Sequence, residues 1–169
     1  MNEKVVVDTN VPRVANAVAG DEWDLRCVAA CIRAVREVQT HGLLVLDDLG
    51  LIVREYLQQL SISGRPGIGD AFARWAHDSQ FDPDCCARVS ITPDDESFAE
   101  FPSDEGLSEF DLADRKFVAV ACAHDQAPHI LQAVDSKWWR LRDELRAAGV
   151  NIQFVCPDTI AELDARKRR

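Results

Sequence analysis

Long hydrophobic runs are missing from this sequence of 169 residues. No apolar stretch approaches the roughly 20 residues that a membrane-spanning helix needs. Asp8 also interrupts the only short apolar run near the amino terminus, so the pattern of a signal peptide is not present. We therefore predict a cytoplasmic protein with no membrane partner.

Cysteines with the spacing of a metal site are missing too. None of the six cysteines forms a CxxC pair or joins a histidine in a cluster with zinc spacing. Most fall on apolar positions of predicted helices or strands, where a thiol packs as a small hydrophobic group. We expect reduced core residues rather than residues with a redox or metal role; they are Cys27, Cys31, Cys85, Cys86, Cys122 and Cys156.

Basic charge is scarce, because 29 acidic residues outnumber 19 basic ones and give a formal charge of −10. Such a charge usually argues against a nucleic-acid partner, whose affinity comes largely from Lys and Arg on phosphates. The acids are concentrated, however: residues 78–114 contain twelve of them and one basic residue, Arg88. The chain then ends in ARKRR, which is typical of a solvated helix end or of a nucleic-acid contact. The overall charge therefore does not exclude a local groove for nucleic acid.

Nucleotide-binding and phosphatase motifs are missing as well. The stretch SGRPGIGD lacks the Gly-Lys-Ser/Thr ending of a Walker loop, and no GxGxxG follows a predicted strand. A haloacid-dehalogenase-type phosphatase would need a second acid two residues after Asp8, where this chain has Asn10. A response-regulator receiver domain would need an acidic pair after the first strand and a Lys at the fifth, which this chain also lacks.

Short apolar strands alternate with amphipathic helices along the chain. The predicted strands cover residues 5–8, 43–47, 87–91, 129–134 and 151–155. The predicted helices cover residues 22–39, 49–60, 70–80, 112–125, 136–149 and 157–169. This alternation predicts an α/β domain over residues 1–169, with a central parallel sheet of about five strands between helices.

One long segment, residues 92–110, has too few periodic apolar residues for a helix. It combines many acids with Phe98, Phe101 and Phe110. Two interpretations are open: a disordered insertion with solvated charge, or an acidic loop beside an active site that restrains the entry of phosphates.

Carboxylates follow several of the predicted strands. Asp8 follows the first strand, Asp47 and Asp48 the second, and Asp135 the fourth. Because the carboxyl ends of parallel strands share one edge of the sheet, we expect Asp8 and Asp135 to lie close together.

Two further acids belong to predicted helices that face the same edge. Glu55 lies in an otherwise apolar helix, and Asp114 precedes the apolar run of another. Each acid also has a purely structural interpretation: Asp114 and Asp135 as helix caps, and Glu55 as the ion-pair partner of a nearby arginine, Arg54 or Arg74. Taken together, the four acids favour a shared site.

Four carboxylates within a few ångströms would repel one another, at a cost of roughly 1–4 kcal/mol for each close pair. Hard divalent cations neutralise such a cluster, and Mg²⁺ combines a few carboxylates with waters and substrate phosphate oxygens. The acids therefore predict a metal site suited to the chemistry of phosphodiesters.

Four motifs carry a resemblance to a known family. VVVDTNV, IVREYL, DLADRKFVAVA and VDSKWW occur in family order and span nearly the whole chain. With these motifs the chain resembles PIN domains, the nuclease fold of toxin–antitoxin ribonucleases and related proteins. The acidic segment 92–110 and the LDDLG stretch are not part of the general motif.

The resemblance implies a three-layer α/β/α fold and a Mg²⁺- or Mn²⁺-dependent endoribonuclease that leaves 5′-phosphate and 3′-hydroxyl ends. It implies a homodimer that acts as a toxin or defence effector and is restrained by an inhibitory protein partner. A DNA-directed nuclease and a catalytically inactive protein-interaction module are the alternatives. By position, the resemblance implies that the catalytic metal ligands are Asp8, Glu55, Asp114 and Asp135, with Asn10 and Ser136 as polar auxiliaries.

Overall fold

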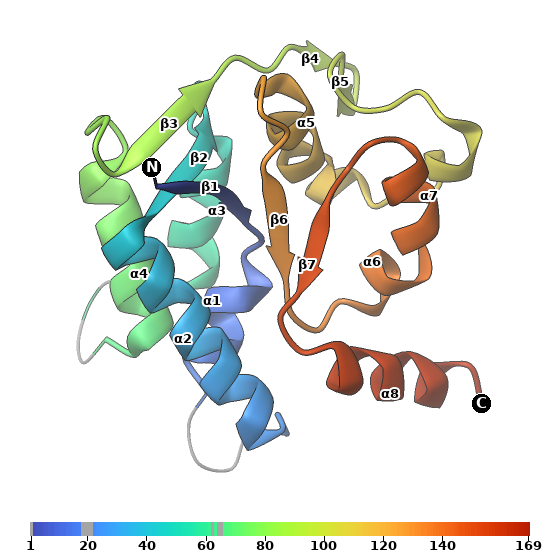
Figure 1. Ribbon diagram of the computed structural model, residues 1–169, viewed down its shortest axis with the longest axis horizontal. Helices are drawn as coiled ribbons and strands as arrows, with labels where there is room; N and C mark the ends of the chain where they lie inside the picture. Colours follow the sequence, from blue (N-terminus) through green and yellow to red (C-terminus); the bar gives the residue numbers. More distant parts are fainter. Residues whose placement is uncertain (1, 18–21, 62, 64–65) are drawn as a thin grey trace.

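The computed structural model describes residues 2–17, 22–61, 63 and 66–169. Five strands form an all-parallel sheet in the order β3-β2-β1-β6-β7, flanked by helices (Figure 1). The predicted α/β fold is therefore confirmed. The strands are β1 (Glu3–Val7), β2 (Gly42–Asp47), β3 (Cys86–Val89), β6 (His129–Gln132) and β7 (Ile152–Phe154).

Helices form over all six ranges that the sequence predicts, and two details differ. A short helix at residues 10–15 was not predicted, because its six residues include Pro12 and are too few for a periodic pattern. The predicted helix 136–149 is interrupted at Leu141, where Arg142 Nη1 donates to the carbonyl of Trp139 at 2.5 Å. The helices are α1 (Asn10–Ala15), α2 (Leu25–His41), α3 (Leu51–Gln59), α4 (Ile68–Ser79), α5 (Arg115–Ala123), α6 (Ser136–Arg140), α7 (Arg142–Ala147) and α8 (Pro157–Lys167).

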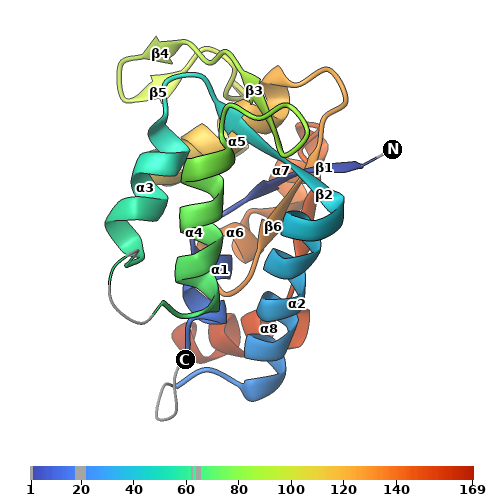
Figure 2. The ribbon, with the colours of Figure 1, turned by 90° about the vertical axis from the view of Figure 1, so that its left-hand side faces the viewer.

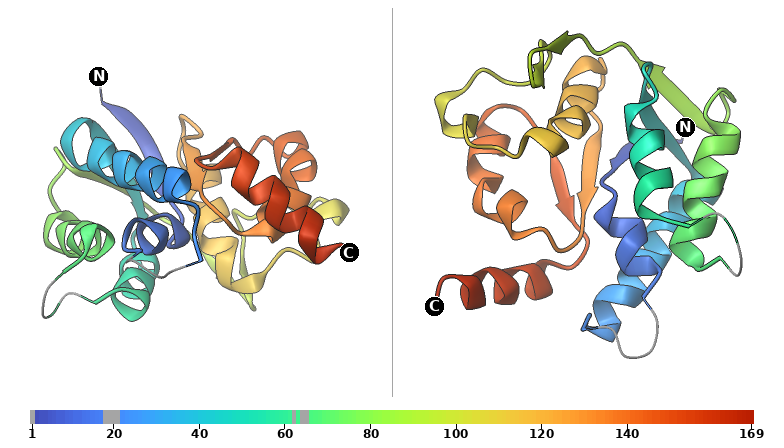
Figure 3. Two further views of the ribbon diagram at one scale, coloured as in Figure 1. Left: turned by 90° about the horizontal axis from the view of Figure 1, so that it is seen from below. Right: turned by 180° about the vertical axis from the view of Figure 1, so that it is seen from behind.

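None of the helices in the described ranges is both long enough and apolar enough to span a membrane. Figure 2 shows α3 and α4 running side by side, with α2 at a distance from α3. Helix α5 packs on β1, β2 and β6 and also contacts α3. The carboxyl end of β1 therefore lies close to both α3 and α5, which the view from behind shows in the right panel of Figure 3.

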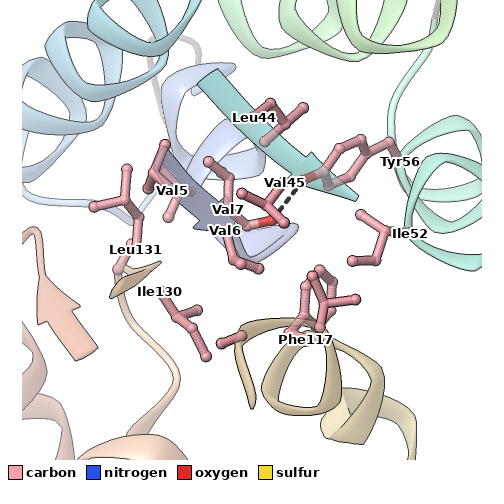
Figure 4. Close-up of a cluster of buried hydrophobic side chains, with 14 of the residues drawn as sticks. Val5, Val6, Val7, Leu44, Val45, Ile52, Tyr56, Phe117, Ile130 and Leu131 are labelled. Carbon is pink, nitrogen blue, oxygen red and sulfur yellow. Dashed lines mark hydrogen bonds between the residues drawn. The ribbon is translucent and has the colours of Figure 1, made fainter. Parts of the chain in front are cut away.

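Strand β1 lies at the centre of the sheet and is pinned on both sides. It pairs with β2 and with β6, and Val7 is in register with Leu131. Val6 and Val7 are fully buried, which explains the uninterrupted valine run. The buried Tyr56 of α3 donates its hydroxyl to the carbonyl of Val7 at 2.5 Å (Figure 4). The core thus fixes the backbone at the point where Asp8 begins.

The expectation that all six cysteines are reduced core residues is wrong. Cys27 and Cys156 form a disulfide with an S–S distance of 2.04 Å and a Cα–Cα distance of 5.3 Å. Their sequence separation of 129 residues gives no hint of the pairing. Of the free cysteines, Cys31 and Cys86 are buried, Cys85 is half-buried and Cys122 is exposed.

Segment 92–110 is folded, so its interpretation as a disordered insertion is wrong. It contains a short antiparallel hairpin of β4 (Pro93–Asp94) and β5 (Ser97–Phe98), followed by a 3₁₀ helix, η1 (Glu105–Leu107). A second 3₁₀ helix, η2 (Leu112–Asp114), leads from it into α5. Phe101, Leu107 and Phe110 are buried, and the Arg115 guanidinium lies 4.5 Å from the centre of the Phe101 ring. Aromatic packing therefore anchors this acidic segment on the core.

Candidate active site

Asp8 is a buried carboxylate at the carboxyl end of the central strand. Its backbone N–H still follows the sheet, donating to the carbonyl of Leu131 at 3.1 Å. Its side chain is only 5% exposed, and Oδ2 accepts a hydrogen bond from the backbone N–H of Asn10 at 3.0 Å. The first turn of the chain after β1 thus holds the carboxylate in a fixed position.

Asp114 and Asp135 reach this region from two other elements. Asp114 ends η2, and its Oδ2 accepts from the indole Nε1 of the fully buried Trp138 at 3.2 Å. Asp135 precedes α6, and its Oδ1 accepts from the backbone N–H of Lys137 at 2.9 Å. The capping interpretation is confirmed for Asp135, whereas the side chain of Asp114 caps no helix.

The electrostatics connect the four predicted acids, because the pKa values of Asp8 and Asp114 are raised and the other two acids are among the causes. Burial raises the pKa of Asp8 well above its ordinary value, and repulsion from Asp114, Glu55 and Asp135 adds to the effect. Burial, followed by repulsion from Asp135, raises the pKa of Asp114 to about 6, and Glu55 also contributes. Such mutual repulsion at the carboxyl edge of a parallel sheet marks a site that favours a cation.

Glu55 differs from the three aspartates because both of its oxygens are engaged. Lys116 Nζ donates to Oε1 at 2.8 Å, and the hydroxyl of Thr9 donates to Oε2. The partner is therefore Lys116 of α5, so the structural interpretation of Glu55 as the partner of a nearby arginine is wrong. This ammonium group supplies positive charge to the acidic cluster.

The two predicted auxiliaries hold neighbouring segments in place. Asn10 bridges to the end of β6, because its Oδ1 accepts from the N–H of Ala133 at 3.0 Å and its Nδ2 donates to Gln132 Oε1. Ser136 is buried beside Asp135, and its Oγ accepts from Lys167 Nζ at 2.9 Å. Asn10 thus fixes the backbone that follows β6, and Ser136 fixes the Lys167 side chain beside Asp135.

A site for a hard divalent cation needs carboxylate oxygens that are free to bind it and that come together from different elements, and the three aspartates offer both. Each uses one oxygen for the hydrogen bond given above, and in the described part of the chain the other oxygen accepts none. The three come from three different elements that meet at one edge of the sheet. Among residues 2–17, 22–61, 63 and 66–169, no three carboxylates have oxygens that all lie within 4.8 Å of one another. The three aspartates would therefore have to move closer together to share one ion.

Four residues of the site were not predicted from the sequence. Thr9 and Lys116 bind Glu55, and Trp138 binds Asp114. Gln132 is fully buried, and its Oε1 accepts from Asn10 and from the N–H of Ala133 at 2.9 Å. Thr9, Lys116 and Trp138 lie within the motifs VVVDTNV, DLADRKFVAVA and VDSKWW, and Gln132 stands out as a polar residue within the apolar run HILQAV.

Two cavities flank the acids. One, of about 450 Å³, is lined by Glu55 and Lys116 and by two acids of the β4–β5 turn, Asp95 and Glu96. The other, of about 580 Å³, is lined by Asp135, Arg13, Lys167 and Trp23, among others. One cavity therefore reaches Glu55 and the other reaches Asp135, whereas Asp8 and Asp114 line neither.

The chain is thus an α/β protein with an acidic cluster at the carboxyl edge of its parallel sheet. Open parallel sheets bind their ligands at this edge. A scan against protein-family models finds no match to the sequence, and a search of curated proteins finds none either.

Proposed function

We propose that this protein is a PIN-type, metal-dependent phosphodiesterase that cleaves RNA. One observation carries the proposal: four acids from separate segments meet at one sheet edge, where Glu55 and Asp135 contribute to the raised pKa values of Asp8 and Asp114. Maintaining such repulsion lowers the stability of the metal-free fold, and a role in binding a cation explains why the acids are together.

In this proposal Asp8, Asp114 and Asp135 would hold Mg²⁺ or Mn²⁺. A bound ion supplies an activated water and neutralises charge on the phosphodiester. The protein itself contributes a rigid frame, since Trp138 holds Asp114 and the first turn of α6 holds Asp135. Lys116 holds Glu55 beside the aspartates. Its ammonium group can also bind a phosphate oxygen of the substrate.

Basic and aromatic groups beside Asp135 support a nucleic-acid substrate. Arg13 and Lys167 line the same cavity as Asp135, and they suit the phosphates of a polynucleotide. Trp23 lines it too, with 36% of its surface exposed, and offers a face for base stacking. Lys167 belongs to the basic carboxyl-terminal stretch ARKRR. Although the protein is acidic overall, basic residues therefore line the cavity through which a substrate would reach Asp135.

A second candidate function is a non-cleaving interaction module with the same fold. The observation that favours it is the engagement of both Glu55 oxygens by Thr9 and Lys116, which leaves three carboxylates rather than four for a cation. Cleavage assays distinguish the two candidates. We expect the purified protein to cut single-stranded or structured RNA with Mg²⁺ or Mn²⁺, to stop in EDTA, and to act weakly on DNA of the same sequence. Absence of cleavage of any substrate with both metals would favour the interaction module.

Metal binding to the acids predicts a rise in melting temperature. An ion at ten times its dissociation constant adds about 1.4 kcal/mol to the stability of the folded state. For a chain of this size, that gives a shift of about 3–6 °C with Mn²⁺ relative to EDTA. The Asp8→Asn variant should show little shift, whereas Asp143→Asn, at an exposed acid on α7, should behave as wild type. Equal shifts in wild type and Asp8→Asn would mean that the ion binds elsewhere.

The β4–β5 turn predicts a restraint on substrate entry. Asp95 and Glu96 share a cavity with Glu55 and Lys116, so their charges repel a phosphate that approaches this side of the site. The double variant Asp95→Asn/Glu96→Gln should cleave nonspecific RNA about 2- to 10-fold faster at low salt, and the gain should fade as salt screens the charges. Asn suits position 95, because Asp95 has a φ of 53° and Asn tolerates this left-handed conformation.

A matched control lies in the same segment. Asp104 and Glu105 are exposed and do not line this cavity, so Asp104→Asn/Glu105→Gln should leave the rate unchanged. Glu100 is kept in both variants, because it accepts from the backbone N–H and the hydroxyl of Thr92 at 2.8 and 2.9 Å. Equal rates for all three proteins at low ionic strength would rule out an electrostatic restraint.

A further inference from the structure

Three sulfur atoms lie together in the core, away from the acidic site. Cys27 and Cys31 are on α2, one helical turn apart, and Cys156 immediately precedes α8. Their sulfur atoms all lie within 4.8 Å of one another, and Cys31 Sγ is 3.9 Å from Cys156 Sγ. Within the described ranges, no other set of three His, Cys, Asp or Glu side chains has ligand atoms this close together.

The disulfide between Cys27 and Cys156 does not account for the third sulfur. A cross-link needs two cysteines, yet Cys31 is fully buried against the bonded pair. The spacing suits a shared ion, because a thiolate lies about 2.3 Å from zinc and two thiolates on one tetrahedral ion are therefore about 3.8 Å apart. The distance from Cys31 to Cys156 already matches this value.

The surroundings favour thiolates at two of the three positions. Cys156 occupies the N-cap position of the eleven-residue α8, and Cys27 lies in the first turn of the seventeen-residue α2. Both therefore lie at the positive end of a helix dipole, which stabilises a thiolate.

An ion also has a way in. A cavity of about 160 Å³ is lined by Cys27 and Cys156, together with Asp24, Arg26 and Asp158. It opens at the amino ends of α2 and α8, where Arg26 is largely exposed. Solvent in this cavity can supply a fourth ligand, as it does at other sites with three protein ligands.

We propose that Cys27, Cys31 and Cys156 form a site for a thiophilic metal ion such as Zn²⁺ when the disulfide is reduced. A dithiol reductant gives two electrons and two protons to the Cys27–Cys156 bond and itself becomes a disulfide. The ion then displaces the three thiol protons to solvent. In a reducing compartment such as the cytoplasm the three thiols would be the resident form. The site is independent of the phosphodiesterase proposed above.

Cobalt titration of the full chain tests this site. The protein is reduced with dithiothreitol, freed of reductant under anaerobic conditions and titrated with Co²⁺, whose thiolate charge-transfer absorption does not report carboxylate binding. We expect one Co²⁺ per reduced wild-type chain, displaced by Zn²⁺, and no such absorption in the oxidised protein. Cys31→Ala and Cys156→Ala should each bind at least about tenfold more weakly, whereas Cys122→Ala, at an exposed cysteine of α5, should bind as wild type.

A second measurement needs no substitution. One equivalent of Zn²⁺ should protect the reduced wild-type protein from re-forming the Cys27–Cys156 disulfide under a mild oxidant, as followed by peptide mapping. Absence of the cobalt absorption in reduced wild type, full retention of it in Cys31→Ala and Cys156→Ala, or disulfide formation at the same rate with and without Zn²⁺ would each overturn the site.

Discussion

Replacing Asp8 by Asn should lower metal-stimulated cleavage of RNA by about 10²–10³-fold or more, because the central ligand of the proposed site loses its charge. Asp135→Asn should have a similar effect, since its carboxylate reaches the same site from α6. The measurement is the single-turnover rate on one RNA substrate at saturating Mg²⁺. Asp143→Asn provides the matched control, as its ion pair with Arg146 at 3.8 Å is exposed.

The same variant separates lost chemistry from lost folding. Asp8 is nearly buried and its carboxylate is repelled by three other acids, so its charged form is disfavoured in the folded state. Removal of this charge should leave the melting temperature in EDTA equal to or above that of wild type. Wild-type cleavage rates in both Asp8→Asn and Asp135→Asn would refute the assignment of the site.

Reduction of the Cys27–Cys156 disulfide should lower the free energy of unfolding by about 2–5 kcal/mol. The cross-link joins residues that are 129 positions apart, and in the chain-entropy description a long closed loop restricts the unfolded chain strongly. Urea denaturation with and without reductant measures the difference, with EDTA present so that no metal replaces the cross-link.

A single-cysteine variant checks that the effect of the reductant comes from this bond. Cys156→Ala cannot form the cross-link, so reductant should leave its denaturation midpoint unchanged. Cys122→Ala keeps the disulfide and should lose stability on reduction as wild type does. If oxidised and reduced wild type unfold at the same urea concentration, the cross-link contributes nothing to stability.

The strands and their acidic ends could be predicted because their signals are local. A strand buried on both faces reads as a short apolar run, and VVVD shows both the run and the carboxylate at its end. Parallel pairing then brings the ends of β1 and β6 together, as the contact of Asp8 N–H with Leu131 O shows. The pattern of elements therefore predicts both acids at the same edge of the sheet, and the pairing of β1 with β6 in the structure makes their strands neighbours.

The features that were missed depend on contacts between distant parts of the chain. Lys116 and Glu55 are 61 positions apart, and nothing near either residue selects the other over Arg54 or Arg74. The aromatic anchoring of segment 92–110 needs Trp138, whose ring lies 5.0 Å from that of Phe110 in an edge-to-face contact. Composition alone made this segment look solvated, because its acids outnumber the few aromatic residues that fix it.

The position of β1 at the centre of the sheet also bears on synthesis of the protein by the ribosome. β1 is made before its partner β6 and before Asp135, and β2 and β3 lie between them in chain order. An acidic centre that needs both Asp8 and Asp135 cannot assemble before β6 and Asp135 have been made, nor in a product that stops before β6. If the protein cleaves RNA as proposed, the messenger being translated meets a competent nuclease only after the ribosome has passed the codons of β6 and Asp135.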